Sequence, residues 1–214
     1  MSNLTERNGA SPAVHFDEAE VEGLAERAKE GEAAAFDQLV RLLGTPMFNL
    51  AYRMVNNRAD ADDLTQEIFV KLHRSIRQFR GESKFSTWLY ALAANTCRSG
   101  LRRLRRTAEM EVVRLDDDGA ADAPKPREPA DPADPPGRGL ERREVREQVE
   151  AAMAELPDEF RMTIVLRDLQ GLSYEEIADA LRCSVGTVKS RLARARFRVK
   201  EQLTREGFAC AAKT

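Results

Sequence analysis

Residues 173–203, SYEEIADALRCSVGTVKSRLARARFRVKEQL, predict two helices joined by a tight turn. Ser173 is a favourable N-cap, and Glu176, three residues later, can complete a capping box at the start of the first helix. The break at residues 182–184 leaves room only for a tight turn between packed helices, and Ser184 can cap the second helix. The stretch is therefore typical of a helix-turn-helix.

The second helix of this pair combines one buried stripe with a strongly basic surface. Its apolar residues recur at three- and four-residue spacing, which predicts a single buried face. Against one acid, Glu201, it carries six cations: Lys189, Arg191, Arg194, Arg196, Arg198 and Lys200. A solvated helix face normally mixes both signs of charge, so this excess favours binding to phosphate.

A helix-turn-helix places the N-terminal residues of its second helix against base edges in the major groove. The side chains in position to reach bases are Thr187, Lys189, Ser190, Ala193 and Arg194. The flanking cations, Arg191, Arg196 and Arg198, suit backbone phosphates. Phe197 lies opposite the buried stripe, and one expectation is that it packs against the C-terminal tail near Phe208.

Composition limits the class of protein. The chain has 214 residues and a net charge of −2, which averages separate basic and acidic blocks. Its three cysteines, Cys97, Cys183 and Cys210, form no CxxC pair, which fits a reducing compartment. No run approaches the roughly 18 apolar residues of a membrane span, and the first residues lack the pattern of a signal peptide. We expect a cytoplasmic protein without membrane insertion.

Helical periodicity with few breaks predicts an all-α fold of two small helical domains. We expect a disordered tail at 1–17, an N-terminal domain at 18–106, a linker at 107–140, a C-terminal four-helix domain at 141–205 and a tail at 206–214. In the first domain Pro46 predicts a new helix start or a kink. A further helix is expected from about Phe85, with Ser83 or Ser86 as its cap.

The linker differs from its neighbours in composition. It holds six of the nine prolines, and its nine acids against four bases give it a net charge of −5. Such a segment buries too little apolar surface to fold, so it predicts a flexible connection between the two domains.

Two charged stretches of the first domain leave alternatives open. The acids at 60–67 either complement a helix dipole or contact a partner. The run at 98–106 has five arginines and no acid, and with Phe79, Phe85, Tyr90 and Asn95 nearby it has the composition of a single-strand binding surface. Trp88 lies on the apolar face of its helix, which favours a place in the core.

Three stretches together resemble the extracytoplasmic-function (ECF) group of the bacterial sigma-70 family of RNA polymerase sigma factors. They are YRMVNNRADADDLTQEIFVKL at 52–72, FRGESKFSTWLYALAANTCRS at 79–99 and ELPDEFRMTIVLRDLQGLSYEEIADALRCSVGTVKSRLARAR at 155–196. Their order on both sides of a linker makes the resemblance specific. It implies a region 2 bundle followed by a region 4 helix-turn-helix.

The resemblance also implies roles for individual residues. The acidic helix would dock on the coiled coil of the largest polymerase subunit through Asp62, Asp63, Gln66 and Glu67. Recognition and melting of the −10 element, with one base flipped out, would use Phe79, Arg80, Ser83, Lys84, Phe85, Asn95, Arg98, Arg102 and Arg103. The helix-turn-helix residues given above would read the −35 element.

The implied partners are core RNA polymerase, through its coiled coil and its flap, promoter DNA and an anti-sigma factor. The resemblance implies no cofactor, no metal and no catalytic residue. The main alternative is a helix-turn-helix regulator that acts without being a polymerase subunit. An enzyme is a poor fit, since His15 and His73 form no Glu-x-x-His motif and the chain has neither a phosphate loop nor a nucleophile elbow.

Overall fold

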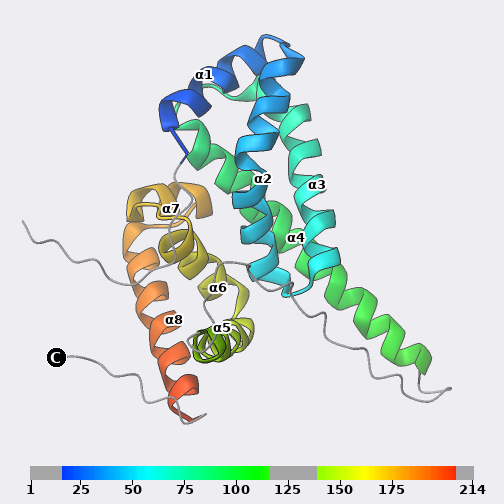
Figure 1. Ribbon diagram of the computed structural model, residues 1–214, viewed down its shortest axis with the longest axis vertical. Coiled ribbons are helices and arrows are strands. Elements are labelled where there is room, and N and C mark those ends of the chain that lie inside the picture. The colour runs from blue at the N-terminus through cyan, green and yellow to red at the C-terminus, as the bar shows by residue number, and fades with distance from the viewer. Residues whose placement is uncertain (1–15, 116–138, 206–214) are drawn as a thin grey trace, which may run out of the picture.

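The computed structural model describes residues 16–115 and 139–205, and within these ranges the chain forms only helices (Figure 1). The first range holds α1 (Glu18–Lys29), α2 (Ala33–Val55), α3 (Arg58–Ser75), the 3₁₀ turn η1 (Ile76–Gln78) and α4 (Phe85–Leu115). The second holds α5 (Gly139–Ala154), α6 (Asp158–Ile164), the π-helical turn η2 (Val165–Leu169), α7 (Tyr174–Leu181) and α8 (Val185–Arg205). The predicted all-α fold is confirmed. Phe208 and most of the predicted tails and linker lie outside the described residues.

The first four helices pack around an apolar core. Its fully buried members include Leu39, Leu43, Met47 and Leu50 of α2, Leu64, Ile68 and Leu72 of α3, and Phe85 and Leu89 of α4. Because α2 carries this buried face on both sides of Pro46, the helix runs unbroken from Ala33 to Val55. A new helix start at Pro46, one of the two expected alternatives, is therefore wrong.

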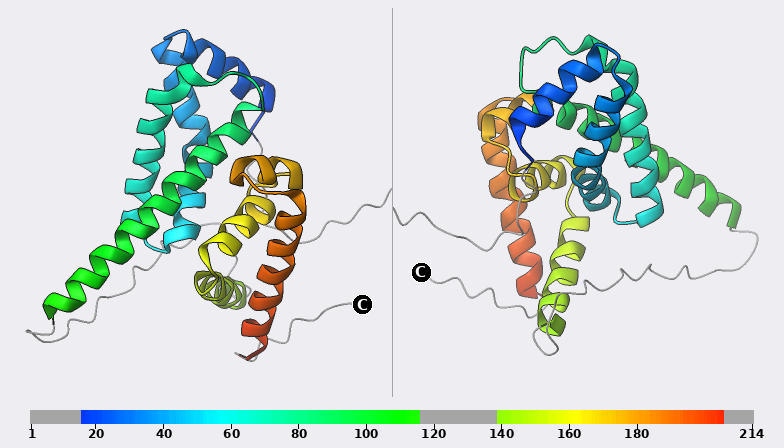
Figure 2. Two further views of the ribbon diagram at one scale, coloured as in Figure 1. Left: turned by 180° about the vertical axis from the view of Figure 1, so that it is seen from behind. Right: turned by 45° about the horizontal axis from the view of Figure 1, so that its top comes forward.

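The helix α4 is longer than the sequence pattern predicted. It extends to Leu115, past the expected end of the domain at residue 106, and projects beyond the ends of α2 and α3 (Figure 2). Residues 107–115 contain neither glycine nor proline, and the Thr107 hydroxyl donates back to the Arg103 carbonyl oxygen at 3.2 Å. Nothing in this stretch stops a helix, so α4 continues as far as Leu115.

The helix-turn-helix forms as the sequence predicts. The Ser173 hydroxyl accepts the Glu176 N–H at 3.1 Å, and the Glu176 carboxylate accepts the Ser173 N–H at 2.8 Å, which completes the capping box. Arg182 ends α7 in the left-handed conformation, with φ of 50°. The Ser184 hydroxyl then caps α8 by accepting the Thr187 N–H at 3.1 Å.

One buried guanidinium joins three helix ends. Arg161, at the last turn of α6, donates to the carbonyl oxygens of Met153 at 2.9 Å and Leu156 at 3.0 Å, and also to that of Ala154. These carbonyls belong to the end of α5, where a helix leaves its last acceptors unpaired. The same guanidinium donates to the Met54 carbonyl oxygen at the end of α2, at 2.6 Å. It therefore connects the second bundle to the first.

The two bundles pack against each other (Figures 1 and 2). The helix α7 lies against the N-terminal part of α4, and α5, α6 and η2 lie against α2. Buried apolar side chains of both bundles form one connected cluster. Polar contacts cross the boundary, including the bond from the Tyr90 hydroxyl to Gln170 Oε1 at 2.9 Å and the ion pair of Arg105 with Asp158 at 2.6 Å. Within the described ranges, no helix has an apolar run long enough to cross a membrane.

The packing of α3 on α4 depends on a glycine. Gly100 is buried in α4, and a Cβ at this position would overlap the side chain of Leu64 in α3. Gly23, in contrast, is exposed in α1, and a Cβ there would meet no atom within 4 Å. The two glycines therefore separate the effect of steric overlap from that of helix propensity.

We expect Gly100→Ala to lower the free energy of unfolding by about 1–3 kcal/mol, because overpacking outweighs the gain in helix propensity. Gly23→Ala should be neutral or slightly stabilising. Urea unfolding followed by the fluorescence of Trp88, the only tryptophan, reports on this bundle. Equal midpoints for the two variants would contradict the close packing at Gly100.

Candidate functional site

The outer surface of α8 carries the side chains that the sequence predicted for reading bases. Lys189, Ser190, Ala193 and Arg194 are exposed, whereas Val188, Leu192 and Ala195 are buried on the opposite side. Thr187 is half-buried at the start of the helix. The structure therefore brings the predicted set together on one accessible surface next to the turn.

Acids from outside α8 neutralise part of its basic surface. Arg191 pairs with Glu159 of α6, and Arg196 donates to Asp168 of η2 at 2.6 and 3.3 Å. The bond to Asp168 raises the pKa of Arg196. Arg194 has no acidic partner among the described residues. The sequence count of charges missed these acids because they lie about 30 residues away and only the fold brings them to α8.

Aromatic rings hold two further cations of this surface. Lys189 Nζ lies 5.9 Å from the ring centre of Tyr174, and the Arg198 guanidinium lies 5.3 Å from that of Phe160. Phe197 remains 67% exposed beside Phe160 and Arg194, at a shallow depression of about 520 Å³. Its expected contact with Phe208 lies outside the described residues.

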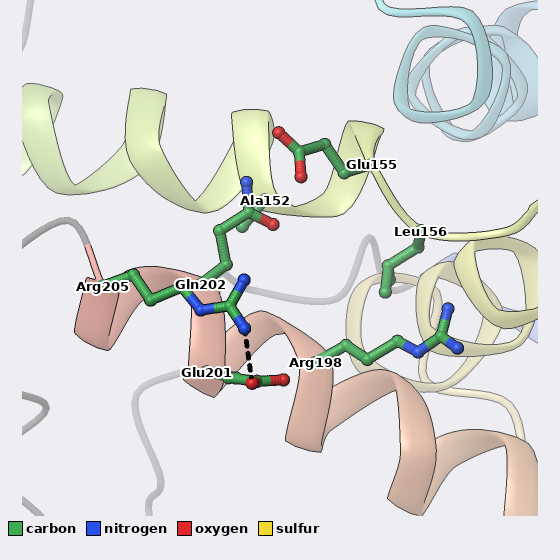
Figure 3. A pocket seen from close by; sticks show the side chains of 7 residues that line it. All are labelled: Ala152, Glu155, Leu156, Arg198, Glu201, Gln202 and Arg205. Carbon is green, nitrogen blue, oxygen red and sulfur yellow. Dashed lines mark hydrogen bonds and ion pairs between the residues drawn. The ribbon is translucent and has the colours of Figure 1, made fainter.

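A second groove, of about 390 Å³, separates α5 from α8 (Figure 3). Charges of both signs line it: Glu155, the residue after α5, on one side, and Arg198, Glu201 and Arg205 of α8 on the other. An ion pair of 2.8 Å joins Arg205 to Glu201. The two glutamates and two arginines balance, so the charged lining of this groove carries no net positive charge to attract phosphate.

The acidic residues of α3 are exposed on a helix that lies away from the second bundle. Asp62, Asp63 and Gln66 are exposed, and α3 lies on the side of the molecule opposite α7 and α8 (Figure 1). Glu67 is half-buried and pairs with Lys71 at 2.8 Å and Arg103 at 3.2 Å. Hydrogen bonds from Lys71, and from Arg103, lower the pKa of Glu67 in spite of its partial burial. The four predicted docking residues thus form one continuous patch.

The residues predicted for the −10 element divide into two groups. Phe79 and Phe85 are buried and pack with Trp88, with ring centres 5.4 to 5.8 Å apart. Because the core buries both rings, they offer no surface on which a base could stack. The remaining members are exposed or half-buried, on the segment before α4 or along α4 itself: Arg80, Ser83, Lys84, Asn95, Arg98, Arg102 and Arg103.

Lys84 connects this segment to the helix-turn-helix. Its Nζ lies 2.7 Å from Glu176 Oε1, and this bond raises the pKa of Lys84. Partial burial works to raise the pKa of Glu176, but the hydrogen bonds from Lys84 and Ser173 outweigh it and lower that pKa. One carboxylate therefore completes the cap of α7 and holds a cation expected to face DNA.

Comparison with known proteins agrees with the arrangement of the two bundles. Residues 39–107 match the family model of sigma-70 region 2, and residues 146–198 match that of sigma-70 region 4. The RNA polymerase sigma-H factor of Pseudomonas aeruginosa is 36% identical over 84% of this chain and 92% of its own length. The ECF RNA polymerase sigma-E factor of Escherichia coli is 37% identical over 81% of this chain and 88% of its own length.

Two solved structures are similar in fold and sequence. CnrH in complex with the cytosolic domain of CnrY aligns with a TM-score of 0.61 and 26% identity, over 88% of this chain and 99% of that one. The sigma factor RpoE of Bartonella quintana, in complex with the anti-sigma factor NepR, also gives a TM-score of 0.61 and 26% identity, over 79% of this chain and 96% of that one.

The pairing on α8 generates a prediction about DNA affinity. Glu159→Gln should raise the affinity of the chain for duplex DNA, because Arg191 can then reach a phosphate without first leaving an acid. The control is Asp179→Asn, which removes an exposed acid of α7. Fluorescence anisotropy at several salt concentrations measures both effects. Equal affinities of wild type and Glu159→Gln at every salt concentration would show that the pair of Arg191 with Glu159 does not compete with DNA.

Proposed function

The chain belongs to the ECF group of sigma-70 family sigma factors, and we propose how its two bundles share promoter recognition. The first docks on core RNA polymerase and opens the −10 element, and the second reads the −35 element. The presence of both family regions in one chain, each on its own bundle, carries this proposal. A regulator that acts without being a polymerase subunit would need only the helix-turn-helix.

We assign polymerase docking to Asp62, Asp63, Gln66 and Glu67 of α3. The first three are exposed while the bundles are packed together, and α3 lies on the side of the molecule opposite α7 and α8, so a partner can reach them. A patch of carboxylates suits a basic surface such as the coiled coil of the largest polymerase subunit, which the family resemblance suggests. The flap of the polymerase is the further contact expected for the second bundle.

We assign contacts with the −10 element to the exposed members of the predicted set. Arg80, Ser83 and Lys84 lie on the segment before α4, and Asn95, Arg98, Arg102 and Arg103 follow along α4. Phe79 and Phe85 support this segment from the core. Holding one unpaired base outside the duplex shifts the equilibrium towards melting, and no covalent chemistry is needed.

We assign base reading in the −35 element to Thr187, Lys189, Ser190, Ala193 and Arg194. Arg191, Arg196 and Arg198 contact phosphates, for which the first two must leave Glu159 and Asp168. The exchange replaces one charged partner by another, so its net cost is small compared with breaking a buried pair.

The protein has no catalytic role of its own in this proposal, because the polymerase forms the phosphodiester bonds. It needs no cofactor and acts in the cytoplasm, where the polymerase is. An inhibitory partner is also part of the proposal, since CnrY and NepR are bound to two similar proteins of known structure.

Reconstituted transcription tests the proposal. Purified protein, bacterial core polymerase and a library of genomic promoter fragments are combined, and transcript starts are mapped by sequencing. We expect new starts that share two upstream motifs at a fixed spacing. If the protein binds DNA but gives the polymerase no new starts, the regulator would be the better account.

Replacing Asp62 and Asp63 together by asparagine should weaken binding to core polymerase by roughly tenfold, because each exposed ion pair at an interface is worth up to about 1 kcal/mol. Asp37→Asn, at an exposed acid of α2, is the control. Titration of labelled protein with core polymerase gives the affinities. Equal affinities for the double variant and the control would exclude this surface of α3.

A further inference from the structure

The segment expected to open DNA is attached at both ends to α1. This segment, residues 79–84, begins at the buried ring of Phe79 and ends at the first turn of α4. Between these points Arg80, Gly81 and Glu82 are exposed, and Gly81 has a positive φ of 72°. The conformation of so exposed a loop depends on how its two ends are held.

The end at α4 lacks a cap of its own. The Lys84 carbonyl oxygen accepts the Trp88 N–H at 3.1 Å, which makes Lys84 the N-cap residue. Lysine has no side-chain acceptor, and its positive charge is unfavourable beside the positive end of a helix dipole. A helix of 31 residues therefore begins with the wrong residue type for local stability.

Carboxylates of α1 supply what Lys84 cannot. Glu22 accepts the Phe85 N–H, at 3.1 Å to Oε2 and 3.4 Å to Oε1, and Glu18 accepts the Ser86 hydroxyl at 3.0 Å. Neither Ser83 nor Ser86, the caps expected from the sequence, takes this role. Both carboxylates also place negative charge at the N-terminus of α4, where it is favourable.

The other end of the segment also contacts α1. Lys29 Nζ lies 6.0 Å from the ring centre of Phe79, and Lys29 is on the same face of α1 as Glu22, about two turns further along. The helix α1 spans residues 18–29, whereas the match to the region 2 model begins at residue 39. The support for the segment thus comes from outside the part of the chain that identifies the family.

We propose that Glu22 is a positioning residue for promoter opening: by capping α4 from α1, it fixes the segment 79–84 in the conformation that receives an unpaired base. The inference rests on the proposed function, since it assumes that this segment opens DNA. It allows Lys84, whose ammonium pairs with Glu176 of α7, to stand at a helix start while a residue 62 positions earlier stabilises the helix.

The experiment compares closed and opened promoter DNA with the full chain and core polymerase. Glu22→Ala removes the cap, Glu22→Gln keeps an acceptor but loses the charge, and Glu20→Ala removes an exposed acid of the same helix as the control. Each is assayed on a duplex promoter and on the same promoter with mismatched, already unpaired bases at −10. Permanganate reactivity of the −10 thymines reports opening, and a titration gives the affinity for polymerase.

We expect Glu22→Ala to reduce thymine reactivity on the duplex by roughly fivefold, the size of effect typical of losing a helix cap. It should match wild type on the mismatched template and in affinity for polymerase. Glu22→Gln should give a smaller deficit on the duplex alone. If Glu22→Ala fails to fold, as judged by its thermal unfolding, Glu22→Gln carries the same comparison.

Two results would overturn the role of Glu22 alone: a Glu22→Ala protein that opens the duplex as well as Glu20→Ala, or one with equal loss on both templates. Failure of the wild-type protein to open any duplex promoter would instead overturn the proposed function, and the role of Glu22 with it.

Discussion

A buried positive charge bonded to main-chain carbonyl oxygens connects the two bundles. The Arg161 guanidinium is surrounded by main-chain carbonyl oxygens, three at the end of α5 and one at the end of α2. A buried cation is costly unless its donors are satisfied, and helix ends are a ready source of acceptors. The position of α6, and with it that of the helix-turn-helix, is therefore tied to the end of α2. Separating the bundles exchanges the Met54 carbonyl for water, while the bonds within the second bundle can stay.

The packed arrangement also pairs many of the cations expected to meet DNA. Lys84 lies against Glu176, Arg103 against Glu67, Arg191 against Glu159 and Arg196 against Asp168. Phosphates and these carboxylates compete for the same guanidinium and ammonium groups. The competition lowers the affinity for arbitrary DNA, whose binding is mainly electrostatic, more than it lowers the affinity for a site that is also read through base edges. A net charge of −2 is thus compatible with a protein that binds a polyanion.

The sequence predicts contacts between near neighbours in the chain well and contacts between distant residues poorly. The capping box of Ser173 with Glu176 and the cap at Ser184 act over three residues, so the helix-turn-helix could be placed from the sequence with its turn. Glu22 caps α4 across 63 residues of sequence, and the acids that pair with α8, such as Glu159, also lie far from it in the sequence. No local pattern indicates either contact. Pro46 shows the same limit, because local preference favoured a break whereas burial on both sides of the proline keeps α2 continuous. Phe79 and Phe85 are aromatic residues next to a basic run, which suits stacking on bases, but the core buries both rings.

The length of α4 makes its second half a rigid spacer. Leu101 is buried, whereas residues 102–110 are exposed or half-buried, and at 1.5 Å per residue the helix continues for about 21 Å from Leu101 to Leu115. The packing of Gly100 against Leu64 sets the direction of α4, so it also sets where Leu115 lies relative to the first bundle. The starting point of the connection to the second bundle is therefore fixed by helix packing.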